Sequence, residues 1–369
     1  MSEMFSKIIE QERSMEDVMF EELSTSTEKN IFYGTSASAK KYYKKFNDKG
    51  LQIDKVIVSQ EYYKKNTFFY KNKVHESTFF LRGNTEKINL VIFFGIDEKS
   101  LNEIKKSDLI EKYYLIDGGV AALGYILHDY IYKYRDQYSK TYKSLSDKVS
   151  RQTMIGFLNT RIGGNASYIN KYCVDEGYFP ANLVEFGDDE VFIDCGAYDG
   201  DTLSAFIKAI GVHNKYKRIY ALEPDPSNYD KLEKNCGNLK SVSLLKIGAY
   251  DESTTLSFAN EATGASHIDQ DGDISICVDR LDNIISSEER VTFIKMDLEG
   301  SELQALKGAK EIIKRCRPIL AISVYHKKED LIAIPEYLKK ILPGYRFYLR
   351  ALCYDSIDVT LFALPEIVE

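Results

Sequence analysis

The second half of the chain alternates short apolar runs with longer segments that are apolar on one face only. Apolar runs of about four to eight residues are typical of buried strands, whereas apolar residues recurring every three or four positions are typical of helices. From residue 190 onward this pattern predicts strands at 191–195, 218–224, 242–250, 254–259, 273–278, 291–297, 318–325, 345–352 and 358–364. It predicts helices between them at 201–211, 226–237, 300–316 and 328–342.

The first half shows a shorter version of the same alternation. Strands are predicted within 30–38, 54–59, 88–95 and 112–117, with helices at 39–50 and 143–162 and an irregular helix at 6–23. We therefore expect an N-terminal helical segment at 1–26, a Rossmann-like accessory domain at 27–140, a helical connector at 141–186 and a main α/β domain at 187–369.

Both α/β domains are predicted to contain largely parallel sheets. Parallel strands need a crossover connection, and the predicted helices between strands supply it. The last two apolar runs have no helix between them, which predicts an antiparallel pair at one edge of the main sheet. In the accessory domain, the turn GTSASA at 34–39 lacks the G-x-G-x-x-G spacing of dinucleotide-binding turns, so we assign it no ligand.

Composition narrows the class of protein. The 369 residues are enough for two or three domains, and a net charge of −7 argues against general nucleic-acid binding. The charged amino terminus lacks the apolar core of a signal peptide, and the most apolar long stretch, 113–132, is interrupted by Asp117, His128 and Asp129. The 6 cysteines form no C-x-x-C pair, as expected of reduced thiols. We expect a cytoplasmic protein without a membrane span.

Polar side chains follow the predicted parallel strands of the main domain. In chain order they are Asp194, Glu223, Asp251, Asp297 with Glu299, and His326. Ligands of open α/β sheets bind at the carboxyl ends of the strands, where the strand order reverses. Because acids recur at four of the five strand ends, we expect them to line one site.

The turn after the first of these strands, DCGAYDGDT at 194–202, suits a ligand close to the main chain. Gly196 and Gly200 allow a sharp turn, and their spacing differs from the dinucleotide pattern. Glu223, on the next strand, is placed to accept both ribose hydroxyls of a nucleoside. Acids here favour a positively charged ligand without a pyrophosphate, and S-adenosylmethionine fits. NAD is the alternative cofactor, and a turn without a ligand is the other interpretation.

Four segments resemble the successive blocks of one enzyme family. They are VFIDCGAYDGDT, YALEPDPSNYDKL, IKMDLEGSELQALKGA and RPILAISVYHKKEDL, within residues 175–365. Together they are similar to the FkbM-type S-adenosylmethionine-dependent methyltransferases, and KMDLEGSE with LKGA is the most specific part. The resemblance implies a seven-stranded class I methyltransferase sheet and O-methylation of hydroxyls on sugars or secondary metabolites, as in polysaccharide biosynthesis. It does not extend to the accessory domain.

The resemblance and the strand-end pattern together give the predicted cofactor site. Its residues are Asp194, Gly196, Ala197, Tyr198, Gly200, Thr202, Glu223, Pro224 and Asp251. Asp199 and Asp201 either contact the same ligand or cap the following helix.

The predicted catalytic residues are Asp297, Glu299 and His326. A hydroxyl acceptor must lose its proton during methyl transfer, and a histidine near neutral pH is a natural base. If the strand continues past Asp297, that carboxylate and Glu299 point the same way and can share a proton or bind a cation. The other interpretation is that Glu299 caps the next helix and Asp297 binds a backbone amide. No metal is assigned, and His267 is a candidate lid residue in the loop 260–272.

We therefore expect an S-adenosylmethionine-dependent O-methyltransferase acting on a small-molecule or glycan substrate. No nucleic-acid partner is expected, and a homo-oligomer is possible. The alternatives are a non-catalytic nucleotide-binding scaffold and an NAD-dependent oxidoreductase. The acids at the strand ends disfavour the scaffold, and the missing G-x-G-x-x-G disfavours the oxidoreductase.

Overall fold

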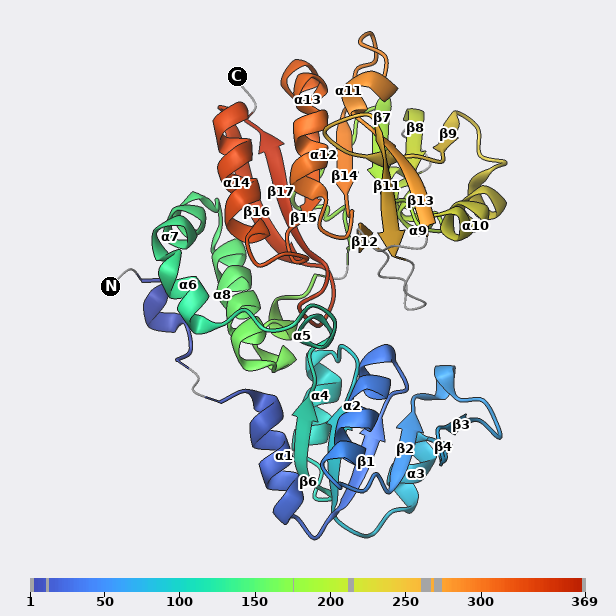
Figure 1. Ribbon diagram of the computed structural model, residues 1–369, viewed down its shortest axis with the longest axis vertical. Coiled ribbons are helices and arrows are strands. Elements are labelled where there is room, and N and C mark those ends of the chain that lie inside the picture. The colour runs from blue at the N-terminus through green and yellow to red at the C-terminus, as the bar shows by residue number, and fades with distance from the viewer. Residues whose placement is uncertain are drawn as a thin grey trace. The chain divides into compact units, whose positions relative to one another are not determined.

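The computed structural model describes residues 3–10, 13–174, 176–211, 216–259, 267–268 and 274–366 (Figure 1). The chain forms two compact units. Unit 1 contains residues 1–135, 152–173 and 353–357, and unit 2 contains residues 136–151, 174–352 and 358–369. No helix in the described part of the chain is long and apolar enough to cross a membrane.

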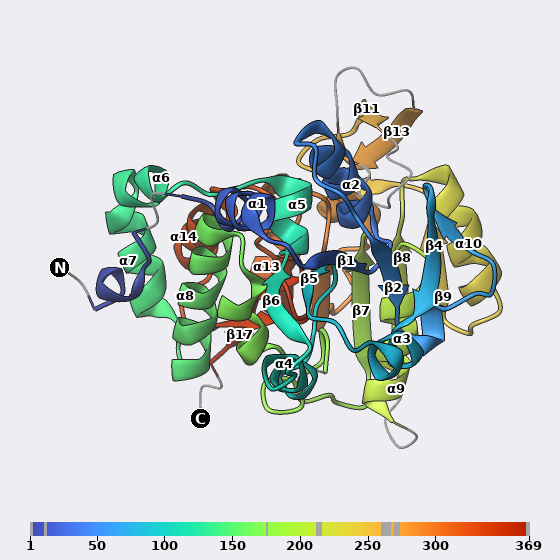
Figure 2. The same ribbon diagram turned by 90° about the horizontal axis from the view of Figure 1, so that it is seen from below.

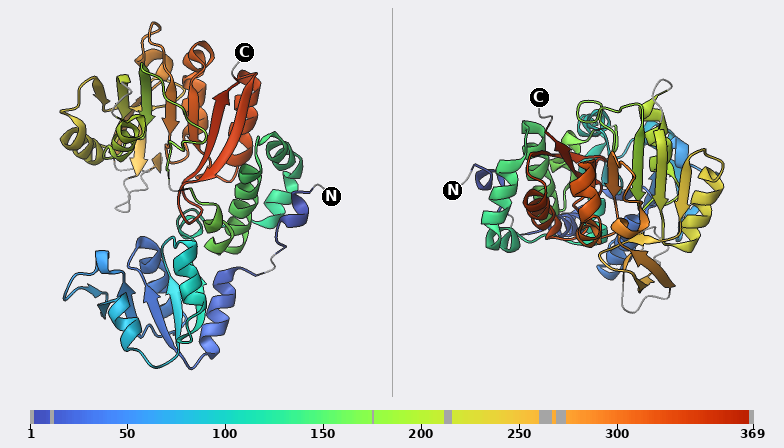
Figure 3. Two further views of the ribbon diagram at one scale, coloured as in Figure 1. Left: turned by 180° about the vertical axis from the view of Figure 1, so that it is seen from behind. Right: turned by 90° about the horizontal axis from the view of Figure 1, so that it is seen from above.

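Unit 2 is built on a seven-stranded sheet with the order β16-β17-β15-β14-β7-β8-β9 (Figures 1 and 3). The strands are β7 (Glu190–Cys195), β8 (Tyr216–Leu222), β9 (Val242–Leu245), β14 (Phe293–Met296), β15 (Ile319–Ser323), β16 (Tyr345–Ala351) and β17 (Val359–Pro365). Neighbours are parallel except for β17, which is antiparallel to β15 and β16. The predicted mostly parallel sheet with an antiparallel edge is confirmed.

Helices cover this sheet. They are α9 (Asp201–Ile210), α10 (Pro226–Cys236), α11 (Leu281–Ile284), α12 (Glu302–Gly308), α13 (Lys310–Cys316) and α14 (Asp330–Ile341). On one face, Leu203 and Phe206 of α9 pack with Phe192 of β7, and Phe179 joins the same cluster from the segment before β7. Pro226 begins α10, and Asp225 caps it by accepting a hydrogen bond from Asn228 N.

Two predicted elements of unit 2 are divided. The strand expected at 242–250 is β9 followed by β10 (Gly248–Ala249), which joins a separate sheet with β11 (Thr254–Ala259), β12 (His267–Ile268) and β13 (Ile274–Asp279). The helix expected at 300–316 is α12 and α13, which meet at Ala309. Gly308, just before the break, lies where a Cβ atom would overlap the carbonyl oxygen of Tyr250, so the chain at this point packs closely against the segment after β10.

Unit 1 is built on a six-stranded, mainly parallel sheet with the order β3-β4-β2-β1-β5-β6. Its strands are β1 (Lys29–Tyr33), β2 (Lys55–Val58), β3 (Phe68–Phe69), β4 (Asn72–Glu76), β5 (Ile88–Ile92) and β6 (Ile110–Leu115), and its helices include α1 (Met15–Thr25), α2 (Ala37–Asp48), α3 (Ser77–Gly83), α4 (Glu98–Lys105), α5 (Gly118–Leu123) and α6 (His128–Lys133). One face packs on α1 and α2 and the other on α3 and α4 (Figure 2). The smaller α/β fold is confirmed.

The helical parts of the prediction are also recognisable. The irregular helix expected at 6–23 is the short turn η1 (Phe5–Lys7) followed by α1, and residues 11–12 between them are outside the described part. The connector contains α7 (Arg135–Ser144), α8 (Lys148–Gly163) and the short turns η3 (Ala166–Tyr168) and η4 (Asn170–Tyr172). The two units divide the chain in another way, because α8 contributes residues to both. The domain limits expected at residues 141 and 187 stay predictions.

Unit 1 includes a loop from the end of the chain. Residues 353–357, between β16 and β17, pack at the carboxyl end of the β5–β6 edge. The buried carboxylate of Asp117 accepts hydrogen bonds from the backbone amide and the hydroxyl of Ser356 and caps α5 through Val120 N. A Cβ atom on Gly119 would overlap the Ser356 hydroxyl, so glycine is required for this approach.

Candidate functional site

The strand order of unit 2 creates a switch point between β7 and β14. From β7 the chain crosses to β8 on one side, and β14 lies on the other side. Crevices form at the carboxyl ends of strands at such points. The predicted residues that follow β7, β8, β14 and β15 therefore meet at one edge of the sheet.

The turn after β7 has the backbone that the two glycines were expected to allow. Gly196 and Gly200 have φ angles of +81° and +91°. A Cβ atom on Gly196 would overlap the carbonyl oxygen of Asp297, and one on Gly200 would overlap the sulfur of Cys236. Gly196 N and Ala197 N both donate to the carbonyl of Leu222, which ties the turn to β8. The spacing D-x-G-x-x-x-G is thus explained by two close approaches.

Glu223 braces the same turn from the end of β8. Its two carboxylate oxygens accept hydrogen bonds from Tyr198 N and Asp225 N, both at 2.9 Å. Burial raises the pKa of Glu223 to about 7, although the two amides oppose the shift. The carboxylate therefore changes charge near neutral pH, at the position where a ribose was expected.

Asp194 is fully buried and faces a lysine that the sequence interpretation missed. Lys295 on β14 is its register partner, and the Lys295 ammonium lies 3.1 Å from the Asp194 carboxylate. The ammonium also donates to the carbonyl of Gly196 at 2.7 Å. Burial raises the pKa of Asp194 to about 6, opposed by the lysine charge. Lys295 stands in the motif IKMDLEG. A lysine inside an otherwise apolar strand was the signal in the sequence by which it could have been identified as a site residue.

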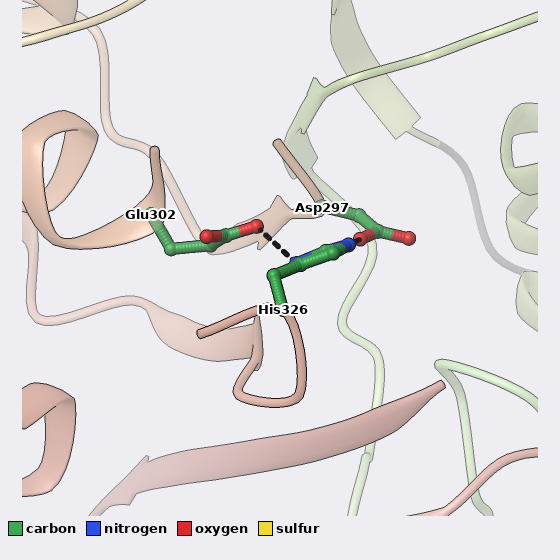
Figure 4. Close-up of side chains that lie close together, drawn as sticks. All are labelled: Asp297, Glu302 and His326. Carbon is green, nitrogen blue, oxygen red and sulfur yellow. Dashed lines mark ion pairs between the residues drawn. The ribbon is translucent and has the colours of Figure 1, made fainter. Parts of the chain in front are cut away.

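His326, which follows β15, lies between carboxylates that follow β14 (Figure 4). Its Nδ1 is 3.0 Å from Glu302 Oε1, and its Nε2 is 3.2 Å from Glu299 Oε2 and 3.5 Å from Asp297 Oδ1. These are ion-pair distances, and neither ring nitrogen has a well-directed hydrogen bond among the described residues. Burial alone would lower the pKa of His326, but Glu302, Glu299 and Asp297 together raise it well above its ordinary value.

Asp297 and Glu299 come together for a different reason from the expected one. The strand ends at Met296, and Glu299 has a left-handed φ of +51°. The turn, rather than a continued strand, directs both carboxylates to the imidazole. Asp297 accepts hydrogen bonds from the hydroxyls of Tyr178 at 3.0 Å and Tyr325 at 3.3 Å. Burial opposes ionisation of Asp297, but His326 and Lys295 lower its pKa.

Glu302 was missed by the sequence interpretation, although it belongs to the same motif. Its Oε1 accepts hydrogen bonds from Leu298 N at 2.7 Å and Gly300 N at 3.4 Å. The carboxylate thus braces the turn before α12, which has no side-chain cap at Ser301, and it also faces His326. In the sequence, Glu302 cannot be distinguished from an ordinary exposed acid at the start of a helix. Only the folded structure shows that it is fully buried.

The remaining predicted residues are distributed around the turn. Tyr198 is exposed, with the Lys231 ammonium 5.0 Å from its ring centre, whereas Thr202 is buried in the first turn of α9. Pro224 is half-buried and adjoins Gly248 of β10, and Asp251 follows β10 rather than the end of β9. Their contacts with a cofactor stay predictions.

The acids within the turn have local partners. Asp199 accepts a hydrogen bond from Asp201 N at 3.3 Å, and Asp201 accepts one from Thr202 N at 2.6 Å. These are local contacts at the start of α9, whose N-cap residue is Gly200, and α9 has no side-chain cap hydrogen bond. The candidate lid residue His267 belongs to β12, while 260–266 and 269–273 of its loop lie outside the described residues.

Asp297, Glu302 and His326 lie close enough together to be considered as metal ligands. However, Glu302 faces Nδ1 of the ring and Asp297 faces Nε2, so the two ring nitrogens are directed toward different acids. An imidazole coordinates a metal through the lone pair of one nitrogen. The arrangement therefore suits a proton on the ring between the carboxylates, and Asp297, Glu299 and Nε2 are the atoms that could face a cation.

The sequence was compared with known families and proteins. Residues 194–347 match the family model described as the methyltransferase FkbM domain. Residues 194–347 are a methyltransferase FkbM domain. The match begins at Asp194 and includes the glycine turn, Glu223 and the whole His326 cluster. The expected family of the C-terminal half is confirmed.

Two curated relatives match part of this chain. The hexuronic acid methyltransferase AglP of Haloferax volcanii is 27% identical over 136 residues, covering 34% of this chain and 52% of that protein. The 2-O-methyltransferase NoeI of Sinorhizobium fredii is 26% identical over 152 residues, covering 35% and 61%. The matches thus span between about half and three fifths of the relatives' own lengths.

A solved structure shares the fold across both units. The methyltransferase FkbM from Methylobacillus flagellatus KT has a TM-score of 0.64 and 22% sequence identity. The likeness covers 94% of this chain and 92% of that chain. The shared fold therefore includes the accessory α/β unit as well as the seven-stranded sheet.

Proposed function

We propose that this methyltransferase moves a methyl group from S-adenosylmethionine to a hydroxyl of a sugar, glycan precursor or secondary metabolite. The observation that carries the proposal is the imidazole–carboxylate cluster after β14 and β15, beside the glycine turn and Glu223. At this switch point a base lies beside the edge of the sheet that would bind a nucleoside. The base could therefore remove a proton from an acceptor hydroxyl next to a bound methyl donor.

The residues present fit the cofactor. The glycine turn and Glu223 lie together at the carboxyl ends of β7 and β8, and the buried Asp194 carboxylate has the Lys295 ammonium beside it but no directed hydrogen bond from the described residues. We assign Glu223 to the ribose hydroxyls, with Ala197, Tyr198, Gly200, Thr202, Pro224 and Asp251 around the same ligand. When bound, the cofactor supplies an electrophilic methyl group on a sulfonium.

Proton transfer is assigned to the cluster. The Glu299 side chain keeps 34% of its surface, whereas that of His326 keeps 3%, so an acceptor hydroxyl meets the carboxylate first. Glu299 and Asp297 orient the hydroxyl, and neutral His326 takes its proton through Glu299, 3.2 Å away. The O–H bond is replaced by an N–H bond on Nε2. With the cofactor bound, the new C–O bond would replace the methyl–sulfur bond, and S-adenosylhomocysteine would be the leaving group. The surrounding acids then stabilise the imidazolium.

The names of the curated relatives support a carbohydrate acceptor. One is a hexuronic acid methyltransferase and the other a 2-O-methyltransferase. We infer a cytoplasmic role in polysaccharide biosynthesis, which agrees with the lack of a disulfide among the described cysteines.

The test is a methyl-transfer assay with isotopically labelled S-adenosylmethionine against nucleotide sugars and glycans. We expect labelled product with the wild type and a fall of about a hundredfold or more in kcat for His326→Ala. The matched control is His128→Ala, at a histidine in unit 1. Unchanged turnover in His326→Ala would remove His326 as the base. Binding of NAD but not of S-adenosylhomocysteine, measured by calorimetry, would overturn the cofactor assignment.

A further inference from the structure

Residues 62–73 of unit 1, which we call the basic hairpin, combine aromatic and cationic side chains without any acid. The sequence YYKKNTFFYKNK contains four lysines, in a chain with a net charge of −7. The segment leads through β3 into β4, and β3 is the outermost strand of the sheet (Figure 1). Its charge and its edge position set it apart from the rest of the unit.

The backbone presents aromatic rings outward while anchoring the hairpin inward. Phe69 is buried, with its ring 5.8 Å from that of Tyr43 on α2, and the preceding Phe68 is 62% exposed. Successive strand residues face opposite sides, so burying Phe69 fixes Phe68 in water. Tyr62 is 72% exposed and Tyr70 is 50% exposed. Large exposed apolar groups gathered in one segment mark interaction sites.

Tyr70 is held in a strained conformation. Its φ is +50°, which is uncommon for an aromatic residue, and its ring stacks on Tyr43 with the centres 4.0 Å apart and an interplanar angle of 11°. The stack orders the tip of the hairpin, so that the exposed rings do not need to be ordered on binding.

The four lysines of the hairpin provide an uncompensated positive charge. Lys64, Lys65, Lys71 and Lys73 are exposed, and none forms an ion pair within the described part of the chain. Two other exposed lysines of this unit, Lys29 and Lys87, are paired with glutamates.

We propose that the basic hairpin docks this protein on the surface of an anionic membrane. Aromatic rings settle at the interface between headgroups and acyl chains, and lysines next to them are attracted to acidic lipids. Because the segment lies at the edge of the sheet and carries exposed rings next to lysines, it matches a flat partner that offers both an apolar layer and a negative charge. An acidic glycan in solution offers the charge without the apolar layer.

The experiment is co-sedimentation of the full chain with vesicles of phosphatidylcholine alone or with added phosphatidylglycerol. We expect about tenfold or more protein on the anionic vesicles, with the difference reduced by high salt. Lys64→Glu/Lys65→Glu is expected to abolish the difference, and Phe68→Ser/Tyr70→Ser to weaken binding at all salt concentrations. The matched control is Lys99→Glu/Lys105→Glu, which makes the same charge change on α4 of the same unit.

Three outcomes would overturn the proposal. They are equal sedimentation with both vesicle types, equal loss of binding in the control variant, and binding to soluble polygalacturonate without binding to vesicles. Thermal unfolding checks that each variant is folded. If one of the two hairpin variants unfolds more than about 5 °C below the wild type, the other hairpin variant provides the comparison. The proposal is independent of the methyl-transfer chemistry.

Discussion

At the scale of single residues, Glu223 links cofactor binding to pH. Burial raises the pKa of Glu223 to about 7, and its ionised form is the better acceptor for ribose hydroxyls. We expect the affinity for S-adenosylhomocysteine to rise about tenfold between pH 6 and pH 8, because the ionised fraction rises by that factor. Calorimetry at both pH values measures it. Glu223→Gln should bind weakly at both, and an unchanged pH dependence in that variant would contradict the assignment.

Glu302 controls the proton affinity of His326. The three acids around the imidazole raise its pKa, so kcat/KM is expected to rise with pH above the ordinary histidine range as the ring becomes neutral. Glu302→Gln keeps the acceptor for Leu298 N but removes one charge, so it should move the rise to lower pH. The measurement is the pH–rate profile, with Glu336→Gln on the exposed side of α14 as control. A profile that stays in place would show that Glu302 has only a structural role.

The buried pair of Lys295 and Asp194 makes a prediction about stability. Lys295→Met leaves the Asp194 carboxylate buried without a counter-charge, which costs about 3–5 kcal/mol. Adding Asp194→Asn should recover most of that loss, as measured by urea unfolding. Lys112→Met, which breaks the exposed contact with Glu22 in unit 1, should cost less than about 1 kcal/mol. An additive double variant would contradict the coupling of the first pair.

At the scale of elements, the turn between β7 and α9 depends on a close approach as well as on its φ angle. Gly196 and Gly211 both have positive φ, at +81° and +74°, but a Cβ atom meets the Asp297 carbonyl at the first and nothing within 4 Å at the second. Gly211→Ala should therefore cost about 1–3 kcal/mol, the strain of its backbone conformation. Gly196→Ala should cost several times more and abolish cofactor binding. Thermal unfolding and calorimetry compare the two, and equal losses would show that φ alone matters.

At the scale of the whole molecule, the segment before β7 belongs to the core of unit 2. Phe179 and Val184 are buried in the same cluster as Phe192 and Phe206. A fragment of residues 187–369 lacks both, so it should be at least about 3–5 kcal/mol less stable than a fragment of residues 174–369. Chemical unfolding of the two fragments measures the difference. Equal stabilities would support the predicted domain limit at 187.

The sequence by itself determined the α/β fold, the parallel sheet with its antiparallel edge and the order of the strand-end residues. Strand and helix periodicities are local, and the glycine turn and the acids after the strands stand at fixed distances from them. The family resemblance of the C-terminal half rests on the same local blocks, and the family model that matches residues 194–347 confirms it.

Only the tertiary structure decided which side chains meet. Glu302 and Lys295 are an ordinary helix acid and a lysine in the sequence, but burial next to His326 and Asp194 gives each a specific partner. The break of the third strand at β10 and the packing of residues 353–357 in unit 1 also depend on contacts between distant segments. Such contacts depend on the strand order, which no local pattern in the sequence contains. The charges interact strongly only after folding removes the water between them.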